Sequence, residues 1–227
     1  YITTSWYLFP KLFGTGVLDE SGQKSQFNQP RVLQAYQSLM GFIDRGHAPL
    51  FVDQTKYPFA PAQGAEGRSA LSFGIYGAMA NPAYRDHTFD VELVPSGPAT
   101  RWTTVIANVW VIGKTSSAPD PAWEWIKWHS QAEQQTTRAS SGTGLPMSKK
   151  AAEDVVAQAA APPKNRRAFL KSLDFAGSLG VNAVWQEWRT AAQNELIKAF
   201  RGEVSLPNAL QETHRLVQGE LDKFYKR

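Results

Sequence analysis

The chain has 227 residues, of which 42% are hydrophobic and 19% are charged. A globular composition of this kind excludes an intrinsically disordered chain, and the length allows one large domain or two modest ones. The formal net charge is +4, but the basic residues are scattered, so we expect solvated helix faces and no nucleic-acid partner.

Cysteine is absent from the sequence, which excludes disulfides and thiolate metal sites. No apolar run approaches the roughly 18 residues that a membrane-spanning helix needs. The eight tryptophans are the unusual feature of the composition. Each offers a broad rigid face and one N–H donor, which suits both packing and the binding of rings. Because the sequence opens at Tyr1 without a methionine, we expect it to be cut from a longer precursor.

The first half of the chain alternates predicted loops, helices and strands. Residues 19–24 predict a hairpin or loop. Asn28 and Pro30 predict the start of a helix, which Gly46 ends. The prolines and glycines of residues 47–68 predict a long loop. Apolar and β-branched runs predict three strands, over 69–75, 89–94 and 103–112. The first strand is expected to be buried, and the last is expected to be central in a sheet.

The second half is predicted to be mainly helical. Asp120 is predicted as an N-cap, with Pro121 at the first helical position and the helix running towards Arg138. Its three tryptophans are expected to pack on the sheet: Trp123, Trp125 and Trp128. Further helices are predicted over 148–160, 163–173 and 182–201, and after a cap at Ser205. Strand–helix alternation followed by helices indicates an α/β chain that ends in an α-helical segment.

The residue patterns of known catalytic and metal sites find no match in this sequence. The four histidines do not pair at metal-ligand spacing. Asp90 and Glu92 alternate along a predicted strand and indicate a solvent-facing side more than a pair of catalytic carboxylates. No phosphate-binding loop or nucleophile elbow is complete. The sequence therefore gives no support for an enzyme, and we expect neither metal nor cofactor.

Several short motifs follow one another in a specific order and spacing. Residues 18–28 contain LDESG followed by FN, residues 63–72 contain QGAEGRSALS, and residues 89–98 contain FDVELVPSGP. The later motifs are NVWVI, a Trp-rich helix, GLP and two closing helices, over 108–112, 118–129, 144–146 and 185–210. Together these segments resemble the family of extracellular solute-binding proteins that includes the maltose-binding and glycerol-phosphate-binding proteins.

The resemblance implies the two-lobed type II periplasmic-binding-protein fold, an α/β fold in which a hinge joins the lobes and ligand lies between them. The fold is expected to be incomplete, because the family's N-terminal stretch has no counterpart here. Residues 1–102 would form the first part of the second lobe. Residues 103–147 would make the hinge crossing and part of the first lobe, and residues 148–227 would return to the second lobe.

The same resemblance implies a set of ligand-binding residues. Trp6, Tyr76 and Trp185 align with positions where aromatic rings stack on a sugar, and Gly77 belongs to the turn of Tyr76. Arg189 follows Trp185 by four residues, so both point from one helix face, and its planar donors suit hydroxyl or phosphate groups. Two more ligand-binding residues are expected just after the crossing: Asn108 and Trp110.

The function that the resemblance implies is that of the solute-binding component of an ABC importer. We expect a monomer outside the cytoplasm, in the periplasm or as a cell-surface lipoprotein, that binds a di- or oligosaccharide and docks to permease subunits. Three alternatives stay open. They are a binding protein for glycerol-phosphate-type ligands, a glycan-active enzyme that needs two carboxylates beside the sugar, and a scaffold or sensor module without transport.

Overall fold

The computed structural model describes residues 2–48, 70–77, 88–142, 144–157 and 163–226. The chain divides into two compact units. The first comprises Tyr1–Phe59, Val94–Val105 and Phe175–Arg227, and the second comprises Ala60–Leu93 and Ile106–Asp174. These boundaries differ from those predicted at residues 102 and 147. The assignment of segments to the two lobes of a binding protein stays a prediction.

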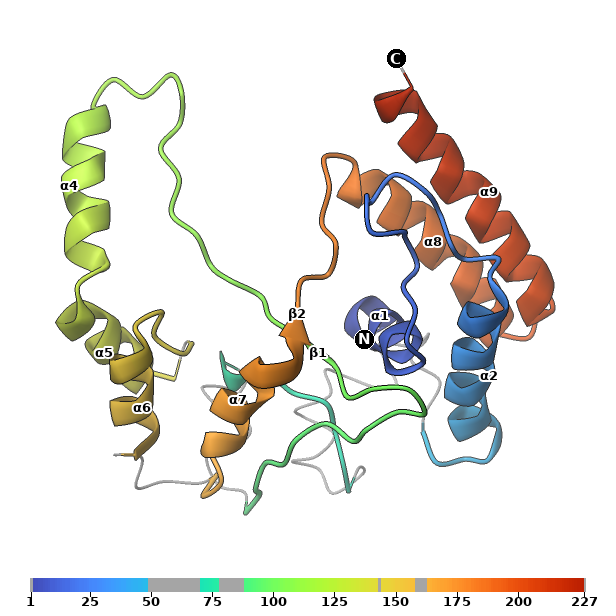
Figure 1. Ribbon diagram of the computed structural model, residues 1–227, viewed down its shortest axis with the longest axis horizontal. Helices are drawn as coiled ribbons and strands as arrows, with labels where there is room; N and C mark the ends of the chain where they lie inside the picture. The colour runs from blue at the N-terminus through green and yellow to red at the C-terminus, as the bar shows by residue number, and fades with distance from the viewer. Residues whose placement is uncertain (1, 49–69, 78–87, 143, 158–162, 227) are drawn as a thin grey trace. The chain divides into compact units, whose positions relative to one another are not determined.

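Helices predominate in both units (Figure 1). The first unit contains α1 (Ile2–Leu12), α2 (Pro30–Asp44), β1 (Thr103–Thr104), β2 (Ala176–Gly177), α8 (Trp185–Phe200) and α9 (Leu206–Tyr225). The second unit contains α4 (Pro119–His129), α5 (Ala132–Ser140), α6 (Lys149–Ala157) and α7 (Arg167–Lys171). A 3-10 turn, η3 (Ser172–Phe175), follows α7. Among the described residues, no helix is both long enough and apolar enough to cross a bilayer.

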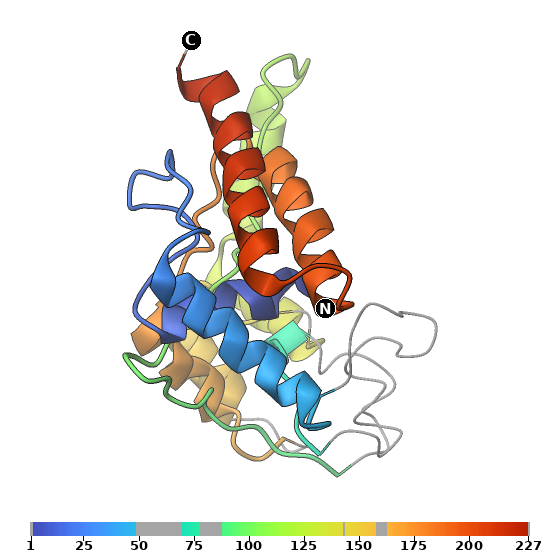
Figure 2. The same cartoon turned by 90° about the vertical axis from the view of Figure 1, so that its right-hand side faces the viewer.

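The core of the first unit lies between α8, α9 and α2. Figures 1 and 2 show α8 and α9 side by side, and α2 also packs against α9. Burial of the apolar stripes of these helices is the main term that stabilises them, because isolated helices of this length are marginal in water. The largest fully buried side chains of this core are Trp188, Tyr36, Phe27, Leu196 and Leu221.

Most of the predicted helices are confirmed. The helices α2, α8 and α9 begin and end within a few residues of the expected positions, and Ser205 is the N-cap of α9. The single helix expected from Asp120 towards Arg138 is wrong, because α4 ends at His129 and α5 begins anew. The N-cap of α4 is Ala118 and not Asp120. The Ser130 hydroxyl donates to the Ile126 carbonyl, and Gln131 is extended, which together end α4.

The predicted strands form only in small part. Within the described part of the chain, the only ladder is parallel and joins Thr103 to Ala176 and Thr104 to Gly177. A strand needs a neighbouring strand to pair its backbone N–H and C=O groups. For the residues described, the prediction of strands is therefore wrong over 69–75, 89–94 and the rest of 103–112. The predicted buried strand instead exposes its apolar side chains: Leu71, Phe73 and Ile75. The loop expected over 47–68 lies outside the described residues from position 49 on.

The tryptophans of α4 also depart from the expectation of a packed helix. Trp123, Trp125 and Trp128 are each about half exposed, and α4 has no buried residue. The surface expected to cover these side chains was a sheet, and no such sheet forms among the described residues of the second unit. The prediction that these three side chains lie in the core is wrong.

Gly97 lies where the chain passes closest to the end of α1. The backbone N–H groups of Ala99 and Thr100 donate to the Leu12 carbonyl, at 3.2 and 3.3 Å. A Cβ on Gly97 would lie 2.5 Å from both the Cβ and the carbonyl oxygen of Leu12. We expect Gly97→Ala to lower the free energy of unfolding by about 1–3 kcal/mol, because backbone must shift to admit the methyl group.

A matched glycine in the same unit gives the control for Gly97. Gly219 lies exposed inside α9, and a Cβ there would meet nothing within 4 Å. Gly219→Ala is expected to raise the free energy of unfolding by up to about 1 kcal/mol, since alanine favours the helix. Urea unfolding followed by circular dichroism measures both variants. Equal effects of the two substitutions would contradict the steric account of Gly97.

Candidate functional site

Three aromatic rings of the first unit meet at the start of α8, and we call them the aromatic cluster: Tyr7, Trp185 and Trp188. The Tyr7 ring lies 5.9 Å from that of Trp185 and 6.3 Å from that of Trp188. The two indoles meet edge to face at 4.8 Å. Trp188 is fully buried, whereas Trp185, the first residue of α8, is only partly buried. The cluster therefore combines a ring in the core with a ring that solvent can reach.

Asn182 connects this cluster to the hairpin loop of residues 18–25. Its side-chain oxygen accepts hydrogen bonds from the Trp188 indole at 3.1 Å and from the Val184 backbone at 3.2 Å. Its amide nitrogen donates to the Gly22 carbonyl at 2.8 Å. One side chain thus fixes both the Trp188 ring and the tip of the loop.

A second amide holds the same loop from the side of α9. The Gln218 side-chain oxygen accepts from the Ser25 backbone N–H at 2.8 Å, and its nitrogen donates to the Gln23 carbonyl at 3.2 Å. An antiparallel bridge between Leu18 and Ser25 closes the loop, which confirms the hairpin predicted over residues 19–24. The loop is thereby anchored to both closing helices.

A pocket of about 260 Å³ opens between the loop, α1 and the segment that precedes α8. Tyr7 belongs to both the pocket and the aromatic cluster. The polar side chains that line the pocket are Lys11, Asp19, Glu20, Ser21, Ser178 and Asn182. A ring face beside several hydrogen-bonding groups is the usual mixture in sites for small polar molecules.

Tyr7 and Asp19 are the two ionisable residues of this pocket whose pKa departs from its ordinary value. Burial raises the pKa of the Tyr7 phenol, so its hydroxyl remains a donor. For Asp19, burial acts to raise the pKa, but the backbone N–H of Lys24 and the hydroxyl of Ser21 outweigh it and lower the pKa overall. The backbone N–H of Gln23 acts in the same direction. Asp19 is therefore an anion that organises the loop from inside.

The lowered pKa of Asp19 predicts a pH-dependent contribution to stability. A carboxyl whose pKa is lower in the folded protein stabilises it above its ordinary value of 3.8, and this stabilisation is lost as pH falls through the lowered value. We expect Asp19→Asn to lower the free energy of unfolding by about 1 kcal/mol at pH 7 and by much less near roughly pH 2. Urea unfolding at both pH values measures this, and an equal loss at both would contradict it.

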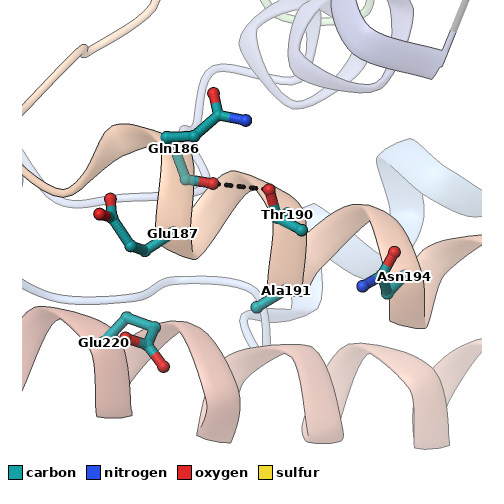
Figure 3. Close-up of a pocket in the computed structure, with 6 residues that line it drawn as sticks. All are labelled: Gln186, Glu187, Thr190, Ala191, Asn194 and Glu220. Carbon is teal, nitrogen blue, oxygen red and sulfur yellow. Dashed lines mark hydrogen bonds between the residues drawn. The ribbon is translucent and has the colours of Figure 1, made fainter.

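A second hollow, of about 460 Å³, runs openly along α8 and α9 (Figure 3). Its lining residues are Gln186, Glu187, Thr190, Ala191, Asn194 and Glu220. The Thr190 hydroxyl donates to the Gln186 carbonyl at 2.7 Å, so it already has an acceptor within the helix. None of these six residues offers a ring, and we regard the pocket beside the aromatic cluster as the better candidate site.

Three of the predicted ligand-binding residues belong to the first unit. Trp6 lies in α1, but its side chain is outside the part that the structure describes. Trp185 joins the aromatic cluster. Arg189 is partly buried on α8, and its Nε atom has no hydrogen-bond partner among the described residues. The roles of all three in binding stay predictions.

The other four predicted residues belong to the second unit. Tyr76 is buried edge-on against Phe169 at 5.3 Å, with Gly77 beside it in a single 3-10 turn. Asn108 and Trp110 are exposed residues of the segment between β1 and α4. Their binding roles likewise stay predictions.

Sequence reasoning missed Tyr7, Lys11 and Asn182, which line the pocket. Tyr7 lies within the apolar run of residues 6–13 and carries no signal that separates it from a core residue. Asn182 lies two residues before Val184, the N-cap of α8, and no side chain caps this helix, so a capping argument does not identify Asn182 either. Lys11 has no such signal.

The metal-ligating residue types and the pair Asp90 and Glu92 can be located among the described residues. Within them, no group of three or more His, Cys, Asp or Glu residues could hold a metal ion. Asp90 and Glu92 are both exposed, as expected, and both accept hydrogen bonds from Asn165, at 2.8 and 3.3 Å. Hydrogen bonds from Asn165 and Val91 lower the pKa of Asp90, which favours its ionised form.

Comparison with known proteins finds similarity of structure and none of sequence. No protein-family model matches the sequence. No curated protein matches it significantly. Among solved structures, the chain is similar to an ABC substrate-binding protein from Listeria monocytogenes in complex with cycloalternan, with a TM-score of 0.79, 19% identity and 96% of this chain covered.

Two further structures are similar over nearly the whole chain. The sugar-binding protein MalE from the phytopathogen Xanthomonas citri matches with a TM-score of 0.75 and 20% identity over 97% of this chain. The cyclic alpha-maltosyl-1,6-maltose binding protein from Arthrobacter globiformis matches with a TM-score of 0.67 and 18% identity over 98% of it. In all three cases the chain spans 56% of the matched structure.

These comparisons confirm, at the level of the fold, the resemblance inferred from the sequence motifs. The chain has the type II periplasmic-binding-protein fold of ABC sugar-binding proteins, and it corresponds to a little over half of such a protein.

Proposed function

We propose that this chain is part of the solute-binding component of an ABC importer and that it binds a carbohydrate. The observation that carries the proposal is the partly buried Trp185 ring, held by Tyr7 and Trp188 beside a polar-lined pocket. A sugar presents apolar C–H faces and hydroxyl edges. An aromatic face covers the first, and carboxylate, amide and hydroxyl side chains bind the second.

The polar groups around the cluster support a ligand with many hydroxyls. Asp19 and Glu20 supply acceptors to the pocket, while Lys11 supplies donors. Two carboxylates against one ammonium favour a neutral ligand over a phosphorylated one, because a phosphate would face the like charge of Asp19 and Glu20.

The fold supports the role as a transport component, the location and the permease partners that belong to the proposal. The matched structures are described as binding proteins for cycloalternan, a sugar or a cyclic maltosyl-maltose, and not as enzymes. Proteins of this kind work outside the cytoplasm, close around their ligand by a hinge motion and dock to membrane permeases. We extend that role to this protein, with a periplasmic or surface-anchored location and permease subunits as partners.

Isothermal titration of the complete protein tests the function. The panel pairs neutral linear and cyclic maltooligosaccharides with glucose 1-phosphate and glycerol phosphate. We expect micromolar or tighter binding of at least one neutral oligosaccharide and weaker binding of the phosphorylated compounds. Tighter binding of a phosphorylated compound would favour the glycerol-phosphate alternative, and lack of binding across the panel would refute the carbohydrate class. Chromatography of the titrated sugars detects the hydrolysis that a glycan-active enzyme would cause.

A further inference from the structure

One ammonium group lies among the polar groups of the pocket beside the aromatic cluster. Among the described residues that line this pocket, Lys11 is the only one with a positive charge. It stands in the last turn of α1. A Cβ on Gly16, another lining residue, would come within 3.3 Å of the Lys11 Nζ atom. The charged end of the lysine, and not only its carbon chain, therefore reaches the pocket wall.

An aromatic ring next to the pocket holds this ammonium in place. The Lys11 Nζ atom lies 5.9 Å from the centre of the Trp102 ring, a distance at which the face of an indole attracts a cation. The Trp102 ring in turn lies against Gly177 of β2, where a Cβ would come within 2.8 Å of the indole Nε1 atom. The Gly177 carbonyl accepts a hydrogen bond from the Val105 N–H at 3.0 Å. A glycine of the ladder thus makes room for the ring that positions Lys11.

No carboxylate neutralises Lys11 within the described part of the chain. None of the ion pairs found there includes it, although Asp19 and Glu20 line the same pocket. The Asp19 carboxylate is occupied within its own loop, where it accepts from the Ser21 hydroxyl at 2.8 Å and from the Lys24 N–H at 3.0 Å. Glu20 is exposed, so water screens its charge. A ligand in the pocket therefore meets the Lys11 ammonium and its N–H donors.

We propose that Lys11 is a specificity-determining residue of this pocket, where its ammonium donates to a hydroxyl of a neutral sugar and excludes amino sugars. A hydroxyl oxygen accepts a hydrogen bond from an ammonium, whereas a protonated amine offers no acceptor and meets a like charge. Asp19 and Glu20 disfavour a phosphate for the opposite reason, so groups of both signs narrow the ligand to neutral sugars. The inference rests on the proposed function, because it concerns the same pocket and the same class of ligand.

Isothermal titration of the complete protein and of its Lys11→Met variant tests this specificity. The probes are the maltooligosaccharides of the panel and their analogues in which amino groups replace the 6-hydroxyls, at a pH where these amines are protonated. We expect the wild-type protein to prefer the neutral sugar by at least about 100-fold, and Lys11→Met to reduce this preference by at least about tenfold. Sugar binding with an unchanged preference in the variant would overturn this inference alone. Failure of the wild-type protein to bind any probe would refute the proposed function and this inference with it.

Two matched variants separate specificity from a structural role. A lysine in the last turn of a helix also stabilises the helix dipole, so Lys11→Met lowers stability slightly whatever its role in binding. Lys198→Met removes the same charge from the last turn of α8 and should leave the preference for neutral sugars unchanged. Lys11→Arg keeps a positive charge and should retain that preference. If Lys198→Met shifts the preference as much as Lys11→Met does, the effect comes from net charge and the proposal is wrong.

Nuclear magnetic resonance tests whether Trp102 positions Lys11 at the ligand. Isotope-labelled reductive methylation marks every lysine and keeps its charge, and the Lys11 signal is the one that the Lys11→Arg protein lacks. The ring current of Trp102 should shift this signal upfield. Trp102→Leu should abolish that shift and weaken the preference for neutral sugars. A bound maltooligosaccharide should move the Lys11 signal more than the Lys198 signal, and a Lys11 signal that does not respond to a bound sugar would overturn the proposal.

Discussion

Trp188→Ala is expected to destabilise the first unit more than any other single truncation considered for this protein. The side chain is fully buried, packs on Tyr7 and Trp185, and donates its indole N–H to Asn182. Removing a buried tryptophan leaves a large cavity and typically costs about 3–5 kcal/mol. The Asn182 oxygen also loses a donor. Urea unfolding followed by far-ultraviolet circular dichroism measures the loss.

The control for this variant is a tryptophan of the same size on the surface. Trp123 is 53% exposed, and no ring contact holds it among those described. We expect Trp123→Ala to change the free energy of unfolding by less than about 0.5 kcal/mol. If both substitutions cost the same, burial in the α8 core would not be the source of the effect.

Trp185→Ala is expected to weaken carbohydrate binding strongly and stability only slightly. The ring is partly buried and belongs to the first residue of α8, so its removal leaves no closed cavity. In the proposed site its face covers the C–H groups of the sugar. Loss of a central tryptophan from a binding site costs about 1.4–2.8 kcal/mol, which corresponds to a tenfold to hundredfold rise in Kd. Isothermal titration against the best ligand of the panel measures the change.

Two further variants make this result interpretable. Trp185→Phe keeps an aromatic face and should retain most of the affinity. Trp128→Ala removes an exposed tryptophan from α4 and should leave the affinity unchanged. Unaltered binding by a folded Trp185→Ala protein would exclude this ring from the ligand site and would refute the observation on which the proposed function rests.

The helices were predictable because their signals are local. Pro30 stands at the first turn of α2, and Ser205 stands at the N-cap of α9. The apolar residues of both helices recur at helical spacing, and these helices bury that stripe within the first unit. The break at Ser130 was missed, where the serine hydroxyl donates to the Ile126 carbonyl. The helix α1 and the N-cap of α4 at Ala118 were missed as well.

The strands were not predictable in the same way. An apolar run such as IANVWVI indicates that a segment can be a strand, but a strand forms only where a neighbour accepts its hydrogen bonds. At Thr103 and Thr104 the neighbour exists within this chain, and there the ladder forms. For residues 106–112 no described segment plays that part. The sequence of a segment does not state whether its partner is present.

Of the three rings in the aromatic cluster, only Trp185 was predicted as a site residue. Trp185 follows from a resemblance of motifs, whereas Tyr7 becomes visible only when α1 is brought against α8. The polar wall depends on Asn182 bonding to Gly22, a residue 160 positions away. Contacts of such sequence separation carry no signature in a single sequence.

The double anchoring of the hairpin loop has a consequence for the thermodynamics of any ligand that enters the pocket. Asn182 and Gln218 fix the loop to α8 and α9 through hydrogen bonds within the protein itself. The polar groups of Asp19 and Ser21 are thereby preorganised, with their hydrogen bonds to each other already made. Little conformational entropy remains to be lost in this wall when a ligand binds. The ordering cost of binding then falls on the ligand and on whatever closes over it, and not on the loop itself.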